Sequence, residues 1–414
     1  MKLSRISKHY IGAIFILLAA NSFATQDMIV AKDGKAEDYF GYSAAIDGNT
    51  LLVGAYKADI NQIMDAGAAY VYVLNDNAWH QQAKLVAAPF FAEDTTGGNV
   101  ALNNDIAVLG VIGRDDKGKD AGAVIVFERH GDSWQQTQII TAPDAKPGDA
   151  FGQSISLTEN HLVIGAPRSD AMGENSGAAY IYKRESDAWQ YQTKIKASDG
   201  AAGDLFGISI AIDGETIVVG ADLHDEKAEN AGAVYVYVLD HDNKWIQEAK
   251  LIADDAGDTD IFGVRVAISG NVALVSARRD DVEGIGIDAG SAYIFERNGR
   301  KWTQKVKLTS PDGQADDRFG RGVALSGDKA IISAMNHDAK GIDTGAVYVY
   351  EKVSGNWQFT SKITANKSFA NDRFGWNIGL SGNKAVIVSP NHDAKGENSG
   401  AVFVKQLKSA TQKQ

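Results

Sequence analysis

The candidate ligand-binding residues of this chain are those that break a regular repeat. They are aromatic or hydrogen-bonding side chains that directly follow a recurring Phe-Gly pair, or that lie in two loops reading Asn-His-Asp-Ala-Lys-Gly. The set is Tyr42, Arg321, Trp376, Asn336, His337, Asn391 and His392. Aromatic faces stack on sugar rings and attract cations, while Arg, Asn and His donate hydrogen bonds. Such a set would suit stacking on a sugar or gripping a peptide side chain.

Recurring aspartates are the candidate metal ligands. They stand seven residues before a Gly-Ala pair, at Asp115, Asp170, Asp225, Asp338 and Asp393. Carboxylate oxygens are the ligands that calcium prefers. An Asp that recurs in a loop also has a simpler explanation, because its side chain hydrogen-bonds the backbone of that loop. The sequence leaves both interpretations open.

Motifs of known catalytic chemistry are missing from the sequence. There is no cysteine nucleophile, no Gly-rich phosphate loop and no His-Glu-x-x-His metal motif. Paired carboxylates such as Asp254 and Asp255 occur so often that no single pair is informative. We therefore expect no enzyme and assign no catalytic residue.

The elements that carry these residues belong to a unit of about 55 residues that recurs seven times. Each unit opens with Asp-x-Phe-Gly, as at residues 149–152, and six units end near a Trp; a worn copy stands at residues 94–97. Within a unit, four short runs rich in Val, Ile and Tyr alternate with tight turns such as Asp213-Gly214. This pattern predicts an all-β fold, a seven-bladed β-propeller with four antiparallel strands per blade.

The two ends of the chain predict how the ring of blades closes. The last unit stops one strand short, after residues 400–405, whereas residues 28–34 align with the end of a fourth strand at 194–200. We expect the N-terminal strand to close the last blade, which removes exposed sheet edges. Blades six, seven and one are then neighbours, so Tyr42, Arg321 and Trp376 should meet at the mouth of the central channel. The alternative is that these side chains only plug the channel.

The first 24 residues predict a secretory signal peptide. Lys2, Arg5 and Lys8 precede an apolar run at 11–20, which small residues follow. We predict three parts: the signal peptide at 1–24, the propeller at 25–408 and a short polar tail at 409–414. The apolar run is too short for a membrane span, and no later stretch approaches one. The mature chain is expected in the periplasm or outside the cell.

The charge of the chain argues against nucleic acid as a partner. The sequence has 53 acidic and 41 basic residues, a net charge of −12, and no cysteine. Many acidic residues fall in the loops before each Phe-Gly and each Gly-Ala, and a four-stranded meander places both sets of loops on one face. Loops on a rigid scaffold are where binding residues usually lie. The same charge also promotes solubility.

The repeated motifs bear a resemblance to a known family. Phe-Gly before a strand, then Ile164-Gly165-Ala166-Pro167 or a variant, then Gly-Ala-x-Tyr-Val-Tyr, resembles the FG-GAP repeats of the integrin α-subunit propeller and its bacterial relatives. Calcium-binding repeats of that family carry an Asp-x-Asp-x-Asp-Gly loop between the first two strands. This chain has only tight turns there, such as Asp47-Gly48-Asn49. We therefore do not transfer those sites and expect no required cofactor, although calcium could still bind among the acidic loops.

The sequence thus predicts a secreted, non-catalytic binding or adhesion module that presents an acidic loop face to a protein partner. The alternative is a glycan-binding propeller that uses the channel mouth of blades six, seven and one. A hydrolase is the third possibility. The ligand and the oligomeric state stay open.

Overall fold

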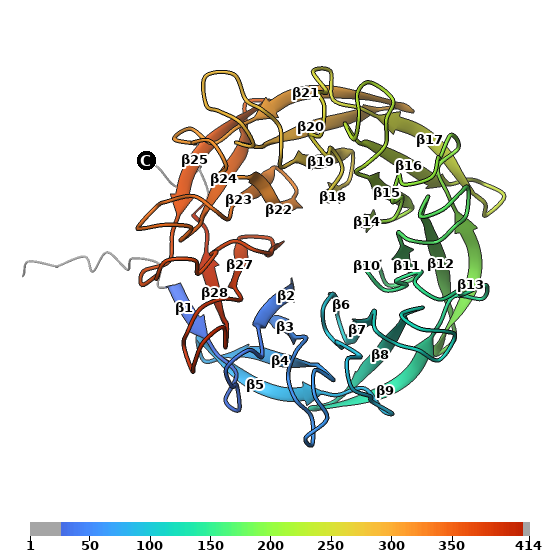
Figure 1. The fold of residues 1–414 in the computed structure, drawn as a ribbon, viewed down its shortest axis with the longest axis vertical. Coiled ribbons are helices and arrows are strands. Elements are labelled where there is room, and N and C mark those ends of the chain that lie inside the picture. Colours follow the sequence, from blue (N-terminus) through green and yellow to red (C-terminus); the bar gives the residue numbers. More distant parts are fainter. Residues whose placement is uncertain (1–25, 409–414) are drawn as a thin grey trace, which may run out of the picture.

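The structure is a computed structural model, and it describes residues 26–408. Figure 1 shows seven four-stranded sheets arranged as the blades of a ring, with the first strand of each blade innermost. The predicted seven-bladed β-propeller is therefore confirmed. The predicted signal peptide at 1–24 and polar tail at 409–414 lie outside the described residues. Among the described residues, no helix has the length and apolar character needed to cross a membrane.

The first four blades follow one another along the chain. Blade one comprises β2 (Phe40–Asp47), β3 (Thr50–Ala55), β4 (Ala68–Asn75) and β5 (Ala78–Leu85). Blade two comprises β6 (Val100–Asn103), β7 (Ile106–Val111), β8 (Ala123–His130) and β9 (Ser133–Ile140). Blade three comprises β10 (Ser154–Leu157), β11 (His161–Ala166), β12 (Ala178–Glu185) and β13 (Ala188–Ile195). Blade four comprises β14 (Ser209–Asp213), β15 (Thr216–Ala221), β16 (Ala233–Leu239) and β17 (Trp245–Leu251).

The remaining blades complete the ring. Blade five comprises β18 (Val266–Ser269), β19 (Val272–Ala277), β20 (Ser291–Asn298) and β21 (Lys301–Leu308). Blade six comprises β22 (Phe319–Ser326), β23 (Lys329–Ala334), β24 (Ala346–Val353) and β25 (Asn356–Ile363). Blade seven comprises β26 (Ile378–Ser381), β27 (Lys384–Ser389), β28 (Ala401–Gln406) and, from the other end of the chain, β1 (Gln26–Ile29).

The N-terminal strand closes the ring, as the sequence predicts. β1 pairs antiparallel with β28, so that Gln26 lies opposite Lys405 and Ile29 lies opposite Val402. The sheet order is β1-β28-β27-β26, which makes β1 the outermost strand of blade seven. The other blades carry their Trp on that outermost strand, and the seventh unit lacks one because its fourth strand comes from the start of the chain.

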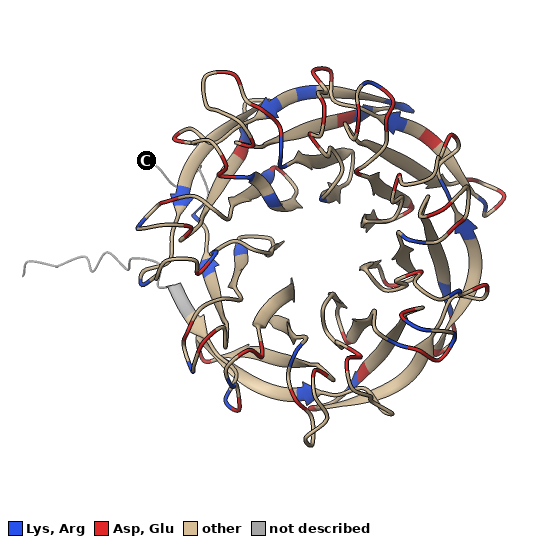
Figure 2. Cartoon of the chain, viewed as in Figure 1, with Lys and Arg blue, Asp and Glu red and all other residues tan. Residues whose placement is uncertain are grey.

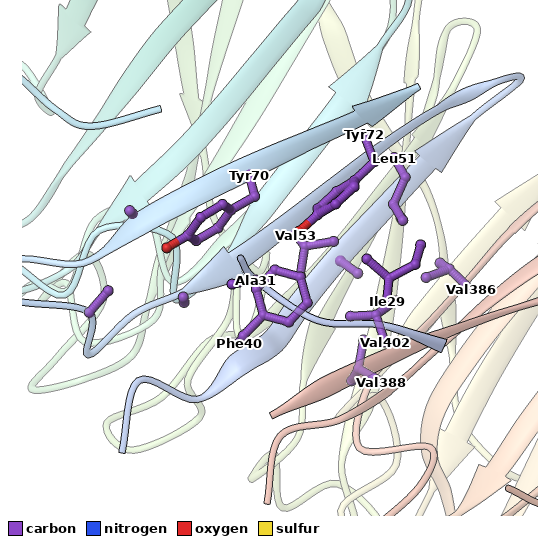
Figure 3. Close-up of a cluster of buried hydrophobic side chains, with 14 of the residues drawn as sticks. Ile29, Ala31, Phe40, Leu51, Val53, Tyr70, Tyr72, Val386, Val388 and Val402 are labelled. Carbon is purple, nitrogen blue, oxygen red and sulfur yellow. The ribbon is translucent and has the colours of Figure 1, made fainter. Parts of the chain in front are cut away.

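The recurring Asp and Phe residues hold the blades in place. In all seven units the Asp that opens the unit accepts a hydrogen bond from the backbone N–H three residues earlier, as Asp149 does from Lys146 at 2.8 Å. The Phe is fully buried between neighbouring blades. Figure 3 shows Phe40 packed beside Tyr70 of blade one and Val402 of blade seven. Both residues therefore serve the structure of the blades.

Glycine is required after that Phe because two blades approach closely there. Gly152 has φ +98°, and a Cβ at this position would lie 2.7 Å from the carbonyl oxygen of Ala123 in the preceding blade. The first strand of every blade therefore starts from a fixed point near the ring axis. The residue that follows the glycine lies within the first residues of that innermost strand or just before it. This placement determines which side chains meet at the axis.

We call the side with the longer loops the loop face. It contains the loops that join the second strand of a blade to the third, and those that join one blade to the next. The opposite side, with the tight hairpins, is the turn face. Figure 2 shows acidic residues distributed over the loops around the ring.

Candidate functional site

Three of the predicted ligand-binding residues meet on the loop face near the ring axis. Trp376, at the start of blade seven, lies between Arg321 of β22 and Tyr42 of β2. The guanidinium carbon of Arg321 is 4.0 Å from the ring centroid of Trp376, and the centroids of Tyr42 and Trp376 are 5.5 Å apart. Tyr56, just after β3, extends the group, since its ring centroid is 4.2 Å from that of Tyr42. Ring closure thus brings blades six, seven and one together in the predicted way.

Three further arginines belong to this group, and the sequence reasoning missed them. Arg373 precedes the Phe-Gly of blade seven, and its guanidinium carbon is 5.9 Å from the centroid of Trp376. Arg265 is the second residue after Phe-Gly in blade five, and Arg278 directly follows β19. Figure 2 shows basic residues on the inner strands around β22. We call the whole set the axial cluster: Tyr42, Tyr56, Asp222, Arg265, Arg278, Arg321, Arg373 and Trp376.

Arg265 occupies a position that has a structural role elsewhere in the ring. At the same position three other blades have a serine whose hydroxyl donates a hydrogen bond to the Phe-Gly glycine carbonyl of the next blade. These serines are Ser43, Ser154 and Ser209, with donor–acceptor distances of 2.6 to 2.7 Å. Arg265 makes no such bond, and one of its terminal nitrogens instead donates to the carbonyl of Val264 at 2.9 Å. The replacement of this serine by Arg265 exchanges a contact between blades for a positive charge.

The arginines of the axial cluster repel one another. Arg321 is only 8% exposed, and its burial together with the charges of Arg265 and Arg278 holds its pKa well below the usual range. Burial and the charge of Arg265 also lower the pKa of Arg278 to about 10. That value still lies far above neutral pH, so the guanidinium group of Arg278 stays charged. The site therefore concentrates positive charge within a protein of net negative charge.

Asp222 is the acidic member of the axial cluster. Its side chain is 7% exposed, and burial raises its pKa to about 6 although Arg265 and Arg278 act in the opposite direction. Its Oδ1 atom has no hydrogen-bond partner, and it forms no ion pair with the arginines within the described part of the chain. A single carboxylate cannot neutralise four guanidinium groups.

Three of the four guanidinium groups lack partners among the described residues. Across residues 26–408, the side chains of Arg278, Arg321 and Arg373 make no hydrogen bond or ion pair, and the Nε atoms of Arg278 and Arg373 are buried without an acceptor. Other buried arginines are satisfied: Arg114 pairs with Asp94 at 3.2 Å and with Asp116 at 2.8 Å. Buried polar groups normally have partners, so the axial cluster has unused hydrogen-bonding capacity.

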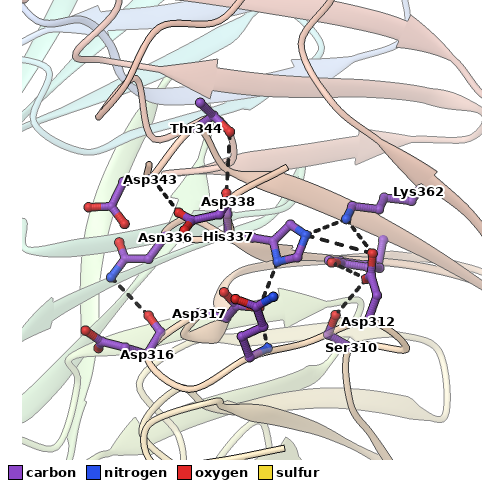
Figure 4. Close-up of polar contacts among 12 residues, drawn as sticks. Ser310, Asp312, Asp316, Asp317, Asn336, His337, Asp338, Asp343, Thr344 and Lys362 are labelled. Carbon is purple, nitrogen blue, oxygen red and sulfur yellow. Dashed lines mark hydrogen bonds and ion pairs between the residues drawn. The ribbon is translucent and has the colours of Figure 1, made fainter. Parts of the chain in front are cut away.

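His337 does not join the axial cluster. Figure 4 shows its imidazole between Asp317 and Lys362, with Nδ1 2.8 Å from Asp317 and Nε2 2.5 Å from the Lys362 ammonium. Lysine can only donate, so Nε2 accepts and the Nδ1 proton is donated to Asp317. The ring links the opening Asp of the unit to the outermost strand, β25, and is buried. The neighbouring Asn336 donates from its amide to the carbonyl of Asp316 at 3.1 Å.

His392 and Asn391 also lie apart from Trp376. The buried ring of His392 packs edge-on against Phe369, with centroids 6.0 Å apart. Both of its nitrogens lack a hydrogen-bond partner among the described residues, and Asn391 is partly buried. Among the described residues no ring contact or hydrogen bond connects either one to the axial cluster. Of the seven predicted ligand-binding residues, the structure therefore brings together three.

The five candidate metal ligands each hold their own loop. Every one accepts a hydrogen bond from the backbone N–H five residues later, over 2.7 to 3.1 Å; the acceptors are Asp115, Asp170, Asp225, Asp338 and Asp393. They belong to five different blades, so they do not converge on one ion. The calcium site therefore stays a prediction, with each aspartate already engaged by backbone.

Another group of metal-ligating side chains, in blade four, surrounds a lysine. Asp199, His224 and Glu226 could offer ligand atoms to one ion. The ammonium of Lys250 lies among them, 2.6 Å from Asp199 and 2.8 Å from Nε2 of His224, and it also pairs with Glu226. A cation of the protein itself thus occupies the place where a metal would bind.

Exposed apolar side chains lie on the loop face of blades five to seven. Ile287, Ile342 and Phe369 are 71%, 67% and 62% exposed. Ile287 and Ile342 each stand three residues before the mid-unit glycine. Charged residues take this place in blades two to four, at Lys119, Glu174 and Glu229. The Ile342 and Phe369 loops are joined by a hydrogen bond of 2.9 Å from the N–H of Asn371 to the Ile342 carbonyl. Blade one has the equivalent pair, Met64 at 58% and Phe91 at 51% exposure, with a hydrogen bond of 3.1 Å from the N–H of Glu93 to the Met64 carbonyl. Exposed apolar side chains thus occur in blade one as well as in the blades that supply the arginines.

Comparison with known proteins supports the repeat and the fold. Seven segments match a sequence profile described as FG-GAP repeat, at residues 23–72, 79–127, 134–182, 189–237, 245–295, 302–350 and 357–405. No curated protein matches the sequence. Among solved structures, a protein from Lactobacillus plantarum aligns with 14% identity and a TM-score of 0.50, over 80% of this chain and 86% of that one. At this identity the similarity concerns the fold alone.

Proposed function

This chain belongs to the FG-GAP repeat family, and on that basis we propose that it is an exported, non-catalytic binding module whose loop face holds a protein partner. A propeller of this family is consistent with a binding module. The finer statement, that the partner is a protein and binds the loop face, is supported by the asymmetry of the ring. A scaffold with seven similar blades has no structural need for exposed apolar residues at loop positions that are charged in other blades.

The observation that carries this proposal is the exposure of Ile287, Ile342 and Phe369. Large apolar side chains at these levels of exposure give up the free energy of burial, about 25 cal/mol for each Å² left in water. Grouped apolar exposure on a soluble protein marks interaction surfaces, and the buried centre of protein interfaces is depleted of charged residues. Blades five to seven therefore offer a surface that a protein partner would cover.

A peptide library displayed on phage and selected against the protein tests the proposal. Selected peptides should lose affinity for the double variant Ile342→Asp and Phe369→Asp. The matched control is the double variant Glu174→Ala and Glu229→Ala, in the loops of blades three and four. The proposal fails if no peptide is selected, or if both double variants bind the peptides equally well.

A glycan is the second candidate ligand, because Tyr42 and Trp376 place two aromatic rings beside Arg321. Aromatic rings and a cation are also what a sugar-binding site uses. An array of oligosaccharides tests this alternative. Glycan binding that Trp376→Ala abolishes, without any peptide binding, would favour the glycan.

Export has its own test. Expression of the full chain in a bacterium with two membranes, followed by mass spectrometry of the protein from the periplasm, would show cleavage after residue 24 if the signal peptide is used. Recovery of the uncleaved chain from the cytoplasm alone would contradict export.

A further inference from the structure

We propose that the axial cluster is an anion site that anchors a carboxylate side chain of the protein partner. This inference rests on the proposed function, and it adds the chemistry of the contact: an Asp or Glu of the partner inserts at the ring axis and is held by Arg321 with Arg265 and Arg278. The surrounding loop face then contacts the residues on either side of that carboxylate.

The first support is the imbalance of charge. The protein has an excess of acidic residues, and several of its half-buried or buried basic side chains elsewhere are paired with carboxylates. Arg297 meets Glu248 at 2.7 Å, for example, and Lys329 pairs with Glu351. In the axial cluster four guanidinium groups have two carboxylates nearby, Asp222 beside Arg265 and Arg278 and Asp343 beside Arg373, and within the described residues neither carboxylate forms an ion pair with them. Keeping unpaired cations out of water costs free energy, so a cluster of this kind needs a reason other than folding.

The second support is the geometry of Arg321. Its guanidinium lies against the face of Trp376 at 4.0 Å, and Tyr42 packs on the same Trp. Stacking orients the guanidinium, while its N–H groups make no hydrogen bond to any residue that the structure describes. A planar fork of free donors matches the two oxygens of a carboxylate, and the contact is then bidentate and charge-assisted. Trp376 acts here as a positioning residue.

A simple plug of the channel explains these residues less well. Side chains that only fill space at the axis would be apolar, because an apolar group has no charge to desolvate. Val264 and Ile208, which follow Phe-Gly in blades five and four, show that aliphatic residues are compatible with the same position. An aliphatic residue could therefore fill this space, and packing alone does not explain the arginines.

The charge around the cluster favours a single carboxylate over a polyanion. The loops that surround the axis contain Asp316, Asp338 and Asp343, which are mostly or partly exposed. These carboxylates would repel a chain with a negative charge on every unit. A peptide in which one Asp or Glu is flanked by basic and apolar residues would complement all three zones: the arginines at the axis, the acidic loops, and the apolar side chains Ile287, Ile342 and Phe369.

A double-mutant cycle between protein and peptide tests the inference. Peptides selected from the library are measured by fluorescence anisotropy against the unmodified protein and the Arg321→Met variant, each with the acidic peptide residue and with its amide. The expected result is a loss of affinity of about ten-fold or more for either single change, and little further loss when both are made. The control is Arg129→Met, because Arg129 lies on the turn face and is already paired with Asp105.

Several results would overturn the inference. Selected peptides without an acidic residue, or a loss from the amide peptide that is the same with Arg321→Met as without it, would refute the carboxylate anchor while leaving the protein partner intact. If Arg321→Met does not fold, Arg278→Met completes the same cycle. Failure to select any peptide would refute both proposals, and binding of uronic acid oligosaccharides alone would replace the peptide by a glycan.

Discussion

Arg321 and Trp376 occupy the same position in two adjacent units and lie in contact, with the guanidinium carbon 4.0 Å from the ring centroid. A cation over an aromatic face is worth about 0.5 to 2 kcal/mol. The same guanidinium is buried and is repelled by Arg265 and Arg278, which lowers its pKa. The cation–π contact stabilises the folded protein, whereas burial and repulsion destabilise it. If the contact is the larger effect, Arg321 serves the fold; if burial and repulsion are larger, its presence is better explained by binding.

Replacing Arg321 by Met should raise the stability of the free protein. The substitution retains an unbranched side chain against Trp376 and removes a buried charge without a partner, so we expect a gain of about 1 kcal/mol, or a few degrees in melting temperature. Differential scanning calorimetry at pH 7 and low salt measures it. Arg129→Met, which breaks an ion pair instead, should not raise the melting temperature. A lower melting temperature for Arg321→Met would mean that Arg321 serves the fold.

The ionisation of Asp222 should lower the stability of the protein as the pH rises from about 4 to about 6. Its pKa is about 6 in the folded protein, against about 3.8 for an ordinary carboxyl group. Between these values the folded state binds more protons than the unfolded state, so the stabilising contribution of Asp222 is full below about pH 4 and is lost as the pH rises to 6. Asp222→Asn should therefore gain stability relative to the unmodified protein over this range, by up to about 3 kcal/mol at pH 7.

Urea unfolding at several pH values between 4 and 7 measures this difference. The charged groups that face Asp222 are Arg265, Arg278 and Arg279. A constant difference between Asp222→Asn and the unmodified protein at every pH would show that the carboxyl group does not titrate there.

His337 should matter for stability and not for binding. His337→Ala removes the link between Asp317 and Lys362 and leaves a buried carboxylate with fewer partners, which costs about 1 to 3 kcal/mol. Chemical denaturation should show this loss, while the affinity for selected peptides stays unchanged. The exposed His130, replaced in the same way, serves as the control. Reduced peptide affinity in folded His337→Ala would return His337 to the binding site.

The seam of the ring should be essential. Deletion of residues 25–34 removes β1 together with Ile29, exposes the edge of β28 and uncovers the residues that pack on Ile29 in the cluster around Phe40. We expect cooperative unfolding or a large fall in melting temperature, followed by circular dichroism. The single substitution Lys32→Ala, at an exposed residue in the same segment, should have little effect. Unchanged melting of the truncated protein would refute the role of the seam.

Calcium should have little effect on stability. The candidate ligands, such as Asp170 and Asp338, each accept a backbone hydrogen bond in separate loops. A ligand that binds only the folded state raises its stability by an amount that grows with the logarithm of the ligand concentration once that concentration exceeds the dissociation constant. The melting temperature in excess calcium and in chelator should therefore agree. A rise of several degrees with calcium would show true ion sites among the acidic loops and would favour cation-dependent adhesion.

Much of the site could be predicted because the repeat fixes positions in space. The contact of Tyr42, Arg321 and Trp376 follows from the number of units and from ring closure. Arg265 was missed although the signal was present, because only the residue directly after Phe-Gly was compared. The residue after that one is a serine in blades one, three and four (Ser43, Ser154 and Ser209), but it is Arg265 in blade five. Arg265 therefore breaks the repeat in the same way as Arg321 and Trp376.

His337 shows the limit of this reasoning. His337 is the third residue after the second strand of its blade. Other blades have a different residue type at this position or share the histidine, as Arg114, Ser169, His224 and Asp280 show, so the position varies within the repeat. Whether such a loop residue faces the axis or the outer strands depends on the backbone of the loop, which includes Asp343 at φ +51°. Neighbouring positions in the sequence point to opposite sides, and the residue types alone do not show which. The partner of each residue, here Asp317 and Lys362, decides its role.

The closure of blade seven by β1 also sets an order of events during folding. β1 is the first strand of the propeller to be synthesised, yet its partner β28 ends at Gln406 and is the last. Six blades can form from segments that are local in the sequence, but the seventh must wait for the whole chain, and pairing of such distant segments is slow. Until then the sheet edge of β28 is open to other chains. The interval between the synthesis of β28 and the docking of β1 is therefore when this protein is most exposed to aggregation and proteolysis.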